Sequence, residues 1–207
     1  MDDWDANSAQ LTQNIGLLME SSVWEDANSR NFPSVCEWHE RLMQKLDVPD
    51  PDWVGAYRGT PGQDTIEVHV DDQWGTPANK VVDEVARFEN ILHQALADLD
   101  IELPHSLINQ SQFTHSSDQL FKVVELCAWA HAEWIRIHPF ANGNGRIARI
   151  WANYIVLRYG LPAFVQIRPR PTPQPYGAVG RQAMQGDWHP TVALFQRMLN
   201  KFLSDLE

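Results

Sequence analysis

The chain reads His138-Pro-Phe-Ala-Asn-Gly-Asn-Gly-Arg-Ile-Ala-Arg149 between two segments with helical spacing. Pro139 disfavours helical geometry at His138, so the helix before it is expected to end there. Helical spacing resumes at Arg146 and continues to Gly160, a typical helix stop. The stretch therefore predicts a glycine-rich loop that joins two helices.

Most of the remaining chain also has helical spacing. Apolar residues recur every three to four positions, the pattern of a helix that buries one face. Ser8 and Ser34 precede two such runs, and Ser34 forms a Ser-x-x-Glu capping box with Glu37. The predicted helices cover about residues 11–18, 35–46, 81–99, 118–137, 146–160 and 191–202. The fold class is therefore mostly α.

Residues 53–70 break this pattern. Two runs, 53–58 and 65–70, flank the turn sequence Thr60-Pro-Gly-Gln63, and the second run alternates with a period of two. These residues predict a β-hairpin. Residues 168–175 are rich in proline and predict an extended connector between helices.

The composition limits the class of protein. The 207 residues allow one domain, and hydrophobic residues make up 43% of them, enough for a core. The net charge of −11 argues against broad binding to nucleic acids or to anionic membranes. Cys36 and Cys127 form no CxxC motif and the N-terminus does not resemble a secretory signal, so a cytoplasmic protein is expected.

The predicted loop has the composition of an anion site. Its glycines let backbone N–H groups turn inward, and the free N–H groups at the start of the next helix face the same hollow. Arg146 and Arg149 lie three residues apart on the first turn, where each can bind phosphate oxygens. His138 lies at the other lip of the loop and can accept a proton near neutral pH. These residues favour phosphoryl or nucleotidyl transfer.

The stretch from His138 to Arg149 resembles the signature of the Fic (Fic/Doc) family, H-x-F-x-[D/E]-G-N-G-R-x-x-R. The sequences Gly-Ala-Tyr-Arg58 and Arg-Tyr-Gly-Leu-Pro162 are also similar to this family, and the resemblance covers about Ser34 to the C-terminus. It implies a helical bundle with a β-hairpin flap, and transfer of AMP from ATP to a Ser, Thr or Tyr hydroxyl of a target protein. The partners it implies are ATP, an unidentified target protein and, in a toxin–antitoxin pair, a small antitoxin protein.

The resemblance also implies roles for single residues. His138 would be the catalytic base that takes the proton of the target hydroxyl, with Asn144 and Arg146 in the catalytic set. Phe140 would pack under the loop and anchor it. Arg146 would bind the inner phosphates and Arg149 the outer one. The complete set of nucleotide-binding residues in the loop would be Gly143, Asn144, Gly145, Arg146 and Arg149.

Two further groups of residues would extend this site. The hairpin over residues 53–70 would be the flap that holds the target by strand addition, with Tyr57 and Arg58 as its target-binding residues. Tyr176 would stack on or hydrogen-bond the nucleotide base, with plain packing as the equally weighted alternative.

Asn142 stands where the family usually has a carboxylate that holds Mg²⁺. An amide oxygen can coordinate Mg²⁺ but brings no negative charge, so weak Mg²⁺ binding is expected. The substitution leaves two alternatives open. One is a phosphotransferase or another nucleotidyl transferase that uses the same loop, and the other is a non-catalytic nucleotide-binding regulator.

Ser21-Ser-Val-Trp-Glu25 resembles the family's inhibitory motif, [S/T]-x-x-x-E-[G/N], although Asp26 stands in its last position. On a helix Ser21 and Glu25 share a face, and Glu25 could pair with Arg149 and displace the outer phosphate. A solvated helix end is the alternative. The expected division is an N-terminal helical segment over 1–31 and a Fic domain over 32–207, with its flap at 53–70 and its signature loop at 138–149.

Overall fold

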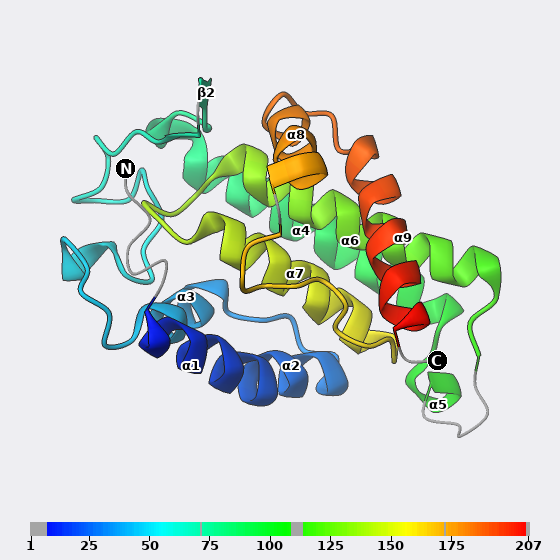
Figure 1. The fold of residues 1–207 in the computed structure, drawn as a ribbon. Helices are drawn as coiled ribbons and strands as arrows, with labels where there is room; N and C mark the ends of the chain where they lie inside the picture. The colour runs from blue at the N-terminus through cyan, green and yellow to red at the C-terminus, as the bar shows by residue number, and fades with distance from the viewer. Residues whose placement is uncertain (1–7, 71, 109–113, 172, 206–207) are drawn as a thin grey trace.

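The computed structural model describes residues 8–70, 72–108, 114–171 and 173–205, and these are mainly helical (Figure 1). The α-helices are α1 (Ala9–Leu18), α2 (Trp24–Ser29), α3 (Val35–Met43), α4 (Ala78–Glu102), α5 (His105–Ile108), α6 (Ser117–Ile137), α7 (Asn144–Arg158), α8 (Pro173–Met184) and α9 (His189–Ser204). A π-helical turn, η1 (Met19–Val23), joins α1 to α2, and a 3-10 turn, η2 (Pro51–Trp53), follows α3. The predicted helical bundle is confirmed.

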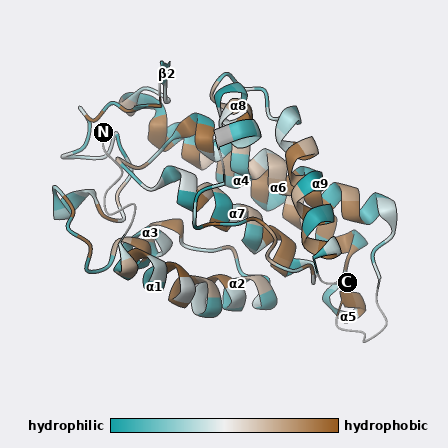
Figure 2. Ribbon diagram, in the orientation of Figure 1, coloured by the Kyte–Doolittle hydropathy of each residue, from teal (hydrophilic) through white to brown (hydrophobic). Residues whose placement is uncertain are grey.

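Helix α7 lies at the centre of the bundle (Figure 1). Every residue from Arg146 to Val156 is buried. Helices α2, α3 and α6 pack against α7, and α6 also packs against α4, α8 and α9. Figure 2 shows both hydrophilic and hydrophobic residues on α1, α4 and α9, as expected for helices that bury one face. Because α7 is held on several sides, its N-terminus and the loop before it have a fixed place.

An aromatic cluster underlies this loop. The ring centroids of Trp38 and Trp151 lie 5.1 Å apart, and those of Phe88 and Trp134 lie 5.3 Å apart, both pairs edge to face. Phe140 of the loop is fully buried, with its ring centroid 6.0 Å from that of Trp134. Such pairs contribute about 0.5–1.5 kcal/mol beyond their buried area. Phe140 therefore attaches the loop to the core.

The hairpin lies further along the chain than predicted. Strand β1 (His69–Val70) pairs antiparallel with β2 (Gln73–Trp74), with His69 opposite Trp74. Within residues 53–68 the structure has turns and η2 rather than strands, so the prediction of a hairpin over 53–70 is wrong. The reason is that the backbone N–H of Arg58 bonds the carbonyl of Pro139 at 2.8 Å, which ties this segment to the loop instead of to a strand.

The N-terminal helices are continuous from α1 to α2. The Ser8 hydroxyl caps α1 by accepting from the Leu11 N–H, as predicted. Ser34 is the N-cap of α3, but no side-chain capping bond forms there, so the predicted capping box with Glu37 is wrong. The π-helical turn η1 adds one residue to a turn of the helix. The side chains that follow it are therefore shifted around the helix axis.

The proline-rich connector ends earlier than predicted, because α8 begins at Pro173. Within α8, Gln174 retains extended backbone angles of φ −114° and ψ 127°.

Of the helices in the described residues, none combines the length and the apolar character that crossing a membrane requires.

Candidate active site

The signature loop is a short link between α6 and α7. Helix α6 ends at His138, whose backbone is left-handed at φ 54° and ψ 55°, and α7 begins at Asn144 after Gly143 at φ 80°. The two reversals let five residues, 139–143, turn the chain from one helix to the next. The prediction of a loop between two helices at this point is confirmed.

Asn144 closes the loop from inside. Its Oδ1 accepts from the Phe140 N–H at 2.9 Å, and its Nδ2 donates to the Phe140 carbonyl at 2.8 Å. The side chain is buried and both of its polar groups are engaged with the loop backbone. Asn144 therefore fixes the shape of the loop backbone, and its side chain is directed to Phe140.

His138 has a neutral ring with one unprotonated nitrogen. Its Nδ1 lies 3.1 Å from the Ile135 carbonyl oxygen and donates to it, which leaves Nε2 as the ring atom with a free lone pair. Desolvation lowers the pKa of His138 to about 4, an effect that Arg58 reinforces and the Ile135 bond opposes. The ring is therefore neutral at physiological pH and able to accept a proton.

Arg58 holds the backbone of His138 in place. The Arg58 side chain is fully buried, and its Nε donates to the His138 carbonyl at 2.9 Å. Its Nη2 donates to the Thr76 carbonyl at 2.9 Å. Tyr57 packs against Phe140, with ring centroids 5.1 Å apart. Arg58 has no exposed surface and Tyr57 faces the loop anchor, so contact of these two residues with a target stays a prediction.

The two arginines of the signature lie on the first turns of α7 and are both buried, with exposed fractions of 7% for Arg146 and 4% for Arg149. Cations near a helix N-terminus oppose the helix dipole, so their burial there is unfavourable without an anion. Arg149 Nε has no hydrogen-bond partner among the described residues. The structure thus concentrates positive charge beside the free N–H groups of α7.

Tyr176 contacts Arg149. The Arg149 Nη1 donates to the Tyr176 hydroxyl at 3.1 Å, and the same hydroxyl lies 2.8 Å from His131 Nε2. His131 is buried, and desolvation lowers its pKa to about 3. Tyr176 therefore lies against Arg149, with its hydroxyl engaged with Arg149 and His131, and its contact with a nucleotide base stays a prediction.

Asn142 fits a divalent metal poorly. Its Oδ1 accepts from the Gly143 N–H at 2.5 Å and from Arg146 Nη2 at 3.1 Å, so a cationic side chain already lies at the oxygen. The described residues contain no group of three or more His, Cys, Asp or Glu side chains that could hold a metal ion. Mg²⁺ prefers carboxylate oxygens, which this site does not supply.

The N-terminal motif lies in η1 and α2, which both pack against α7. Ser21 and Glu25 are exposed, and the Ser21 hydroxyl donates to the Leu17 carbonyl at 2.6 Å. Among the described residues, Glu25 forms no ion pair with Arg149. Because η1 contains Ser21 and ends before Glu25, the two residues do not follow the α-helical spacing that was assumed. Inhibition by this segment, and the division at residue 31, stay predictions.

His39 is a site residue that sequence reasoning missed. Its ring stacks on Phe140 with centroids 3.9 Å apart and planes at 9°. Its Nε2 lies 3.1 Å from the Asn142 carbonyl oxygen, and its Nδ1 accepts from the Gly55 N–H at 2.9 Å. A lone histidine on an amphipathic helix gives no signal in the sequence, because its partners are distant in the chain.

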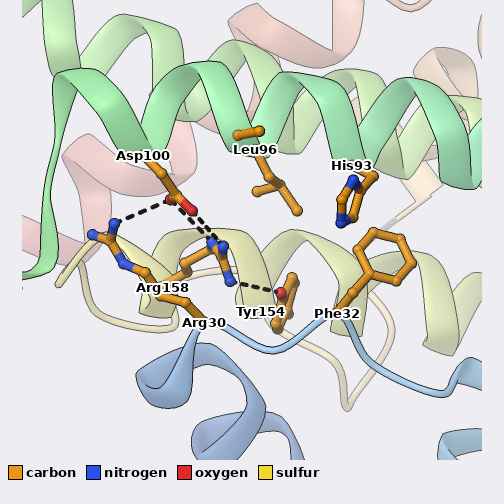
Figure 3. Close-up of a pocket in the computed structure, with 8 residues that line it drawn as sticks. Arg30, Phe32, His93, Leu96, Asp100, Tyr154 and Arg158 are labelled. Carbon is orange, nitrogen blue, oxygen red and sulfur yellow. Dashed lines mark hydrogen bonds and ion pairs between the residues drawn. The ribbon is translucent and has the colours of Figure 1, made fainter.

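A separate pocket of about 100 Å³ lies near the other end of α7 (Figure 3). In it Asp100 pairs with Arg30 at 3.2 Å and with Arg158 at 2.6 Å. Arg158 also donates to the Tyr154 hydroxyl at 3.2 Å. These contacts join the N-terminal helices, α4 and α7. Arg158 follows Arg146 by about 18 Å of helix, so this pocket is distinct from the loop.

Comparisons with known proteins agree with this fold and loop. The chain is 34% identical over 180 residues to the protein adenylyltransferase Fic of Nematostella vectensis, which covers 86% of this chain and 34% of that protein. It is 41% identical over 69 residues to the protein adenylyltransferase fic-1 of Caenorhabditis elegans, covering 33% of this chain and 13% of that protein. The chain thus spans about a third or less of these relatives.

Two solved structures share the fold. A Fic domain containing signaling protein from Bacteroides thetaiotaomicron has a TM-score of 0.60 and 19% identity, covering 94% of this chain and 67% of that one. The BepC protein of Bartonella tribocorum, solved with bound AMPPNP, has a TM-score of 0.52 and 18% identity, covering 90% and 86%. The sequence model of the Fic/DOC family matches residues 31–156, more than half of the chain, which therefore belongs to the Fic/DOC family.

Proposed function

We propose that this chain is a protein adenylyltransferase that transfers AMP from ATP to a hydroxyl of a target protein. The observation that carries the proposal is the placement of a neutral His138, with Nε2 unprotonated, at the lip of a loop followed by two buried arginines. The relatives named protein adenylyltransferase support the same activity.

The residues present suggest how the transfer proceeds. The target hydroxyl attacks the α-phosphorus of ATP while His138 Nε2 takes its proton. The bond from that phosphorus to the leaving pyrophosphate oxygen breaks, and the loop N–H groups, Arg146 and Arg149 stabilise the charge that develops. Asn144 contributes by holding the loop in the shape that directs its N–H groups at the phosphates. No step passes through a metal, because the donor set around Asn142 fits Mg²⁺ poorly.

The hairpin of β1 and β2 is the proposed flap. A Cβ placed on Gly75 would lie 3.0 Å from the His138 Cβ, so the strand end after Trp74 touches the base directly. Trp74 is 66% exposed, a large apolar side chain free to contact a target segment. An extended target segment paired with β2 would therefore lie near His138.

The free thiols of Cys36 and Cys127 favour a reducing compartment such as the cytoplasm.

Labelled ATP tests the proposal. The chain is incubated with a cell lysate and ATP labelled on either the α- or the γ-phosphate, with the His138→Ala variant as control. Transfer of the α-label alone supports an adenylyltransferase. Transfer of the γ-label would instead assign a phosphotransferase, and no transfer with retained ATP binding would assign a nucleotide-binding regulator.

A further inference from the structure

His39 connects two parts of the site that are distant in the sequence. Its imidazole is fully buried between α3, the segment at Gly55 that leads to the flap, and the signature loop. The ring face stacks on Phe140, while the two ring nitrogens face opposite backbones. His39 therefore contacts the loop twice, through Phe140 and the Asn142 carbonyl. Its third contact is with Gly55, in the segment 55–58, which is called the flap stem below.

The hydrogen bonds define the tautomer of His39. Nδ1 accepts from the Gly55 N–H, so it carries no proton and Nε2 must carry it in the neutral ring. Nε2 then donates to the Asn142 carbonyl oxygen at 3.1 Å. A protonated ring would have no acceptor for Gly55, which agrees with the burial that lowers the pKa of His39 to about 4.

Side chains of α3 lie close to the backbones of Gly143 and Gly55, on either side of His39. A Cβ on Gly143 would lie 2.6 Å from Met43 Cε and 3.3 Å from His39 Nε2. A Cβ on Gly55 would lie 2.5 Å from Glu40 Cγ. Both glycines also have positive φ angles, 80° and 74°. Side chains of α3 thus contact both glycines, at the loop and at the segment that leads to the flap.

We propose that His39 is a positioning residue that sets the anion loop and the flap stem through its two ring nitrogens, each nitrogen controlling one of them. The bond from Nε2 holds the Asn142 carbonyl away from the phosphates and so keeps the loop N–H groups pointed into the hollow. The bond to Nδ1 holds Gly55, and with it the start of the segment that carries Arg58 and the flap. The consequence for catalysis rests on the adenylyl transfer proposed above.

Three substitutions separate the two bonds. His39→Gln places an amide N–H near the position of Nε2 and keeps the donor to Asn142, but it leaves Gly55 without an acceptor. His39→Asn places an amide oxygen near the position of Nδ1 and keeps the acceptor for Gly55, but it does not reach the loop. His39→Phe keeps the stacking on Phe140 and loses both bonds.

The experiment measures each bond by its own readout. Calorimetry gives the Kd of AMPPNP, and hydrogen exchange gives the protection of the Gly55 amide. We expect His39→Asn and His39→Phe to weaken AMPPNP binding by about fivefold, in line with the loss of one hydrogen bond, and His39→Gln to retain it. We expect Gly55 to lose protection in His39→Gln and His39→Phe and to keep it in His39→Asn.

A matched control is His115→Phe, which removes another imidazole-to-carbonyl contact, from His115 Nε2 to the Tyr159 oxygen at 2.8 Å, at the far end of α7. It should lower Tm without changing either readout. If Kd and Gly55 protection instead change together in all three His39 variants, in proportion to their loss of Tm, the residue is merely structural and the proposal is overturned. Both readouts are independent of AMP transfer, so an inactive wild-type chain would contradict the proposed function alone.

Discussion

Arg58 donates a hydrogen bond from Nε to the carbonyl oxygen of His138 at 2.9 Å, across 80 positions of sequence. Its Nη1 donates to the Ile66 carbonyl at 3.0 Å and its Nη2 to the Thr76 carbonyl at 2.9 Å. Residues 66 and 76 lie on either side of the hairpin, so one guanidinium holds both ends of the flap and the backbone of the base. Burial lowers the pKa of Arg58 to about 10, which leaves it charged at neutral pH.

Replacing Arg58 should therefore damage stability and transfer together. Arg58→Met fills much of the same volume but leaves several buried carbonyl oxygens without a donor, each costing about 1–3 kcal/mol. We expect a loss of roughly 3 kcal/mol in the free energy of unfolding, measured by urea titration. Arg87→Met, in which an exposed arginine paired with Glu84 at 3.9 Å is replaced, is the control and should change stability by less than about 0.5 kcal/mol. An Arg58→Met variant as stable as the wild type would contradict this account.

His138→Ala should abolish most transfer without removing nucleotide binding. General base catalysis typically contributes about 10² to 10⁴-fold, and the His138 side chain forms its hydrogen bond with Ile135 rather than with the loop. Initial rates with α-labelled ATP measure the first effect, and calorimetry with AMPPNP measures the second. Labelling at the wild-type rate would remove His138 from the mechanism.

The pH dependence of stability follows from the buried histidines. Burial lowers the pKa of His39 to about 4, that of His131 to about 3 and that of His138 to about 4, from the ordinary histidine value of 6.5. Between about pH 4 and 6.5 the unfolded chain binds more protons than the folded chain, so stability is lost as the pH falls through this window. Tm measured from pH 7.5 to 4.5 should decrease.

Variants identify the histidines responsible for that decrease. The decrease should be shallower in His131→Phe, because one buried titrating group is gone. It should be unchanged in His189→Asn, which replaces an exposed histidine beside Asp187. A flat Tm profile in the wild type would show that these rings are not held neutral by the fold.

Sequence reasoning predicted the loop and its helices because their signals are local. Pro139 and Gly143 interrupt strong helical spacing, and the structure has the interruption at those residues. The hairpin was misplaced because the alternation over 65–70 indicates extended backbone, but of that run only His69 and Val70 pair with a strand, and their partner is Gln73–Trp74 rather than residues 53–58. Tyr57 packs on Phe140, and Arg58 satisfies carbonyls that only the folded chain brings together.

The role of His39 was beyond sequence reasoning for a related reason. Its partners Gly55 and Asn142 lie 16 and 103 positions away, and no spacing rule connects them. The π-helical turn η1 likewise gives no signal in the sequence, so the relative placement of Ser21 and Glu25 could not be derived from α-helical periodicity. Local sequence signals predicted most of the helices and the loop. Which side chains lie in the candidate site depends on contacts between residues that are distant in the chain.

Arg149 should contribute mainly to binding the outer phosphates. Its buried guanidinium has an unpartnered Nε, and Tyr176 supports it through a bond of 3.1 Å to Nη1. Arg149→Ala should weaken binding of AMPPNP more than binding of AMP, as measured by calorimetry. Tyr176→Phe keeps the ring beside Arg149 but removes the hydroxyl, and it should weaken AMPPNP binding by a smaller factor, about twofold to fivefold. An equal loss for AMPPNP and AMP in Arg149→Ala would contradict the outer-phosphate assignment.

Asn142 should make the chain a weak binder of Mg²⁺, because its Oδ1 is neutral and already accepts from Arg146 Nη2 at 3.1 Å. Asn142→Asp adds a negative charge at the same oxygen, the kind of ligand that Mg²⁺ prefers, so the AMPPNP-bound variant should bind Mg²⁺ more tightly than the wild type in a calorimetric titration. The added carboxylate also attracts Arg146, which works against this gain. Asn142→Ala separates the two effects, because it frees Arg146 without adding charge and should leave Mg²⁺ affinity nearly unchanged. If Asn142→Asp binds AMPPNP normally but gains no affinity for Mg²⁺, then residue 142 does not lie where a metal beside the phosphates would be held, and the explanation of weak Mg²⁺ binding by Asn142 is wrong.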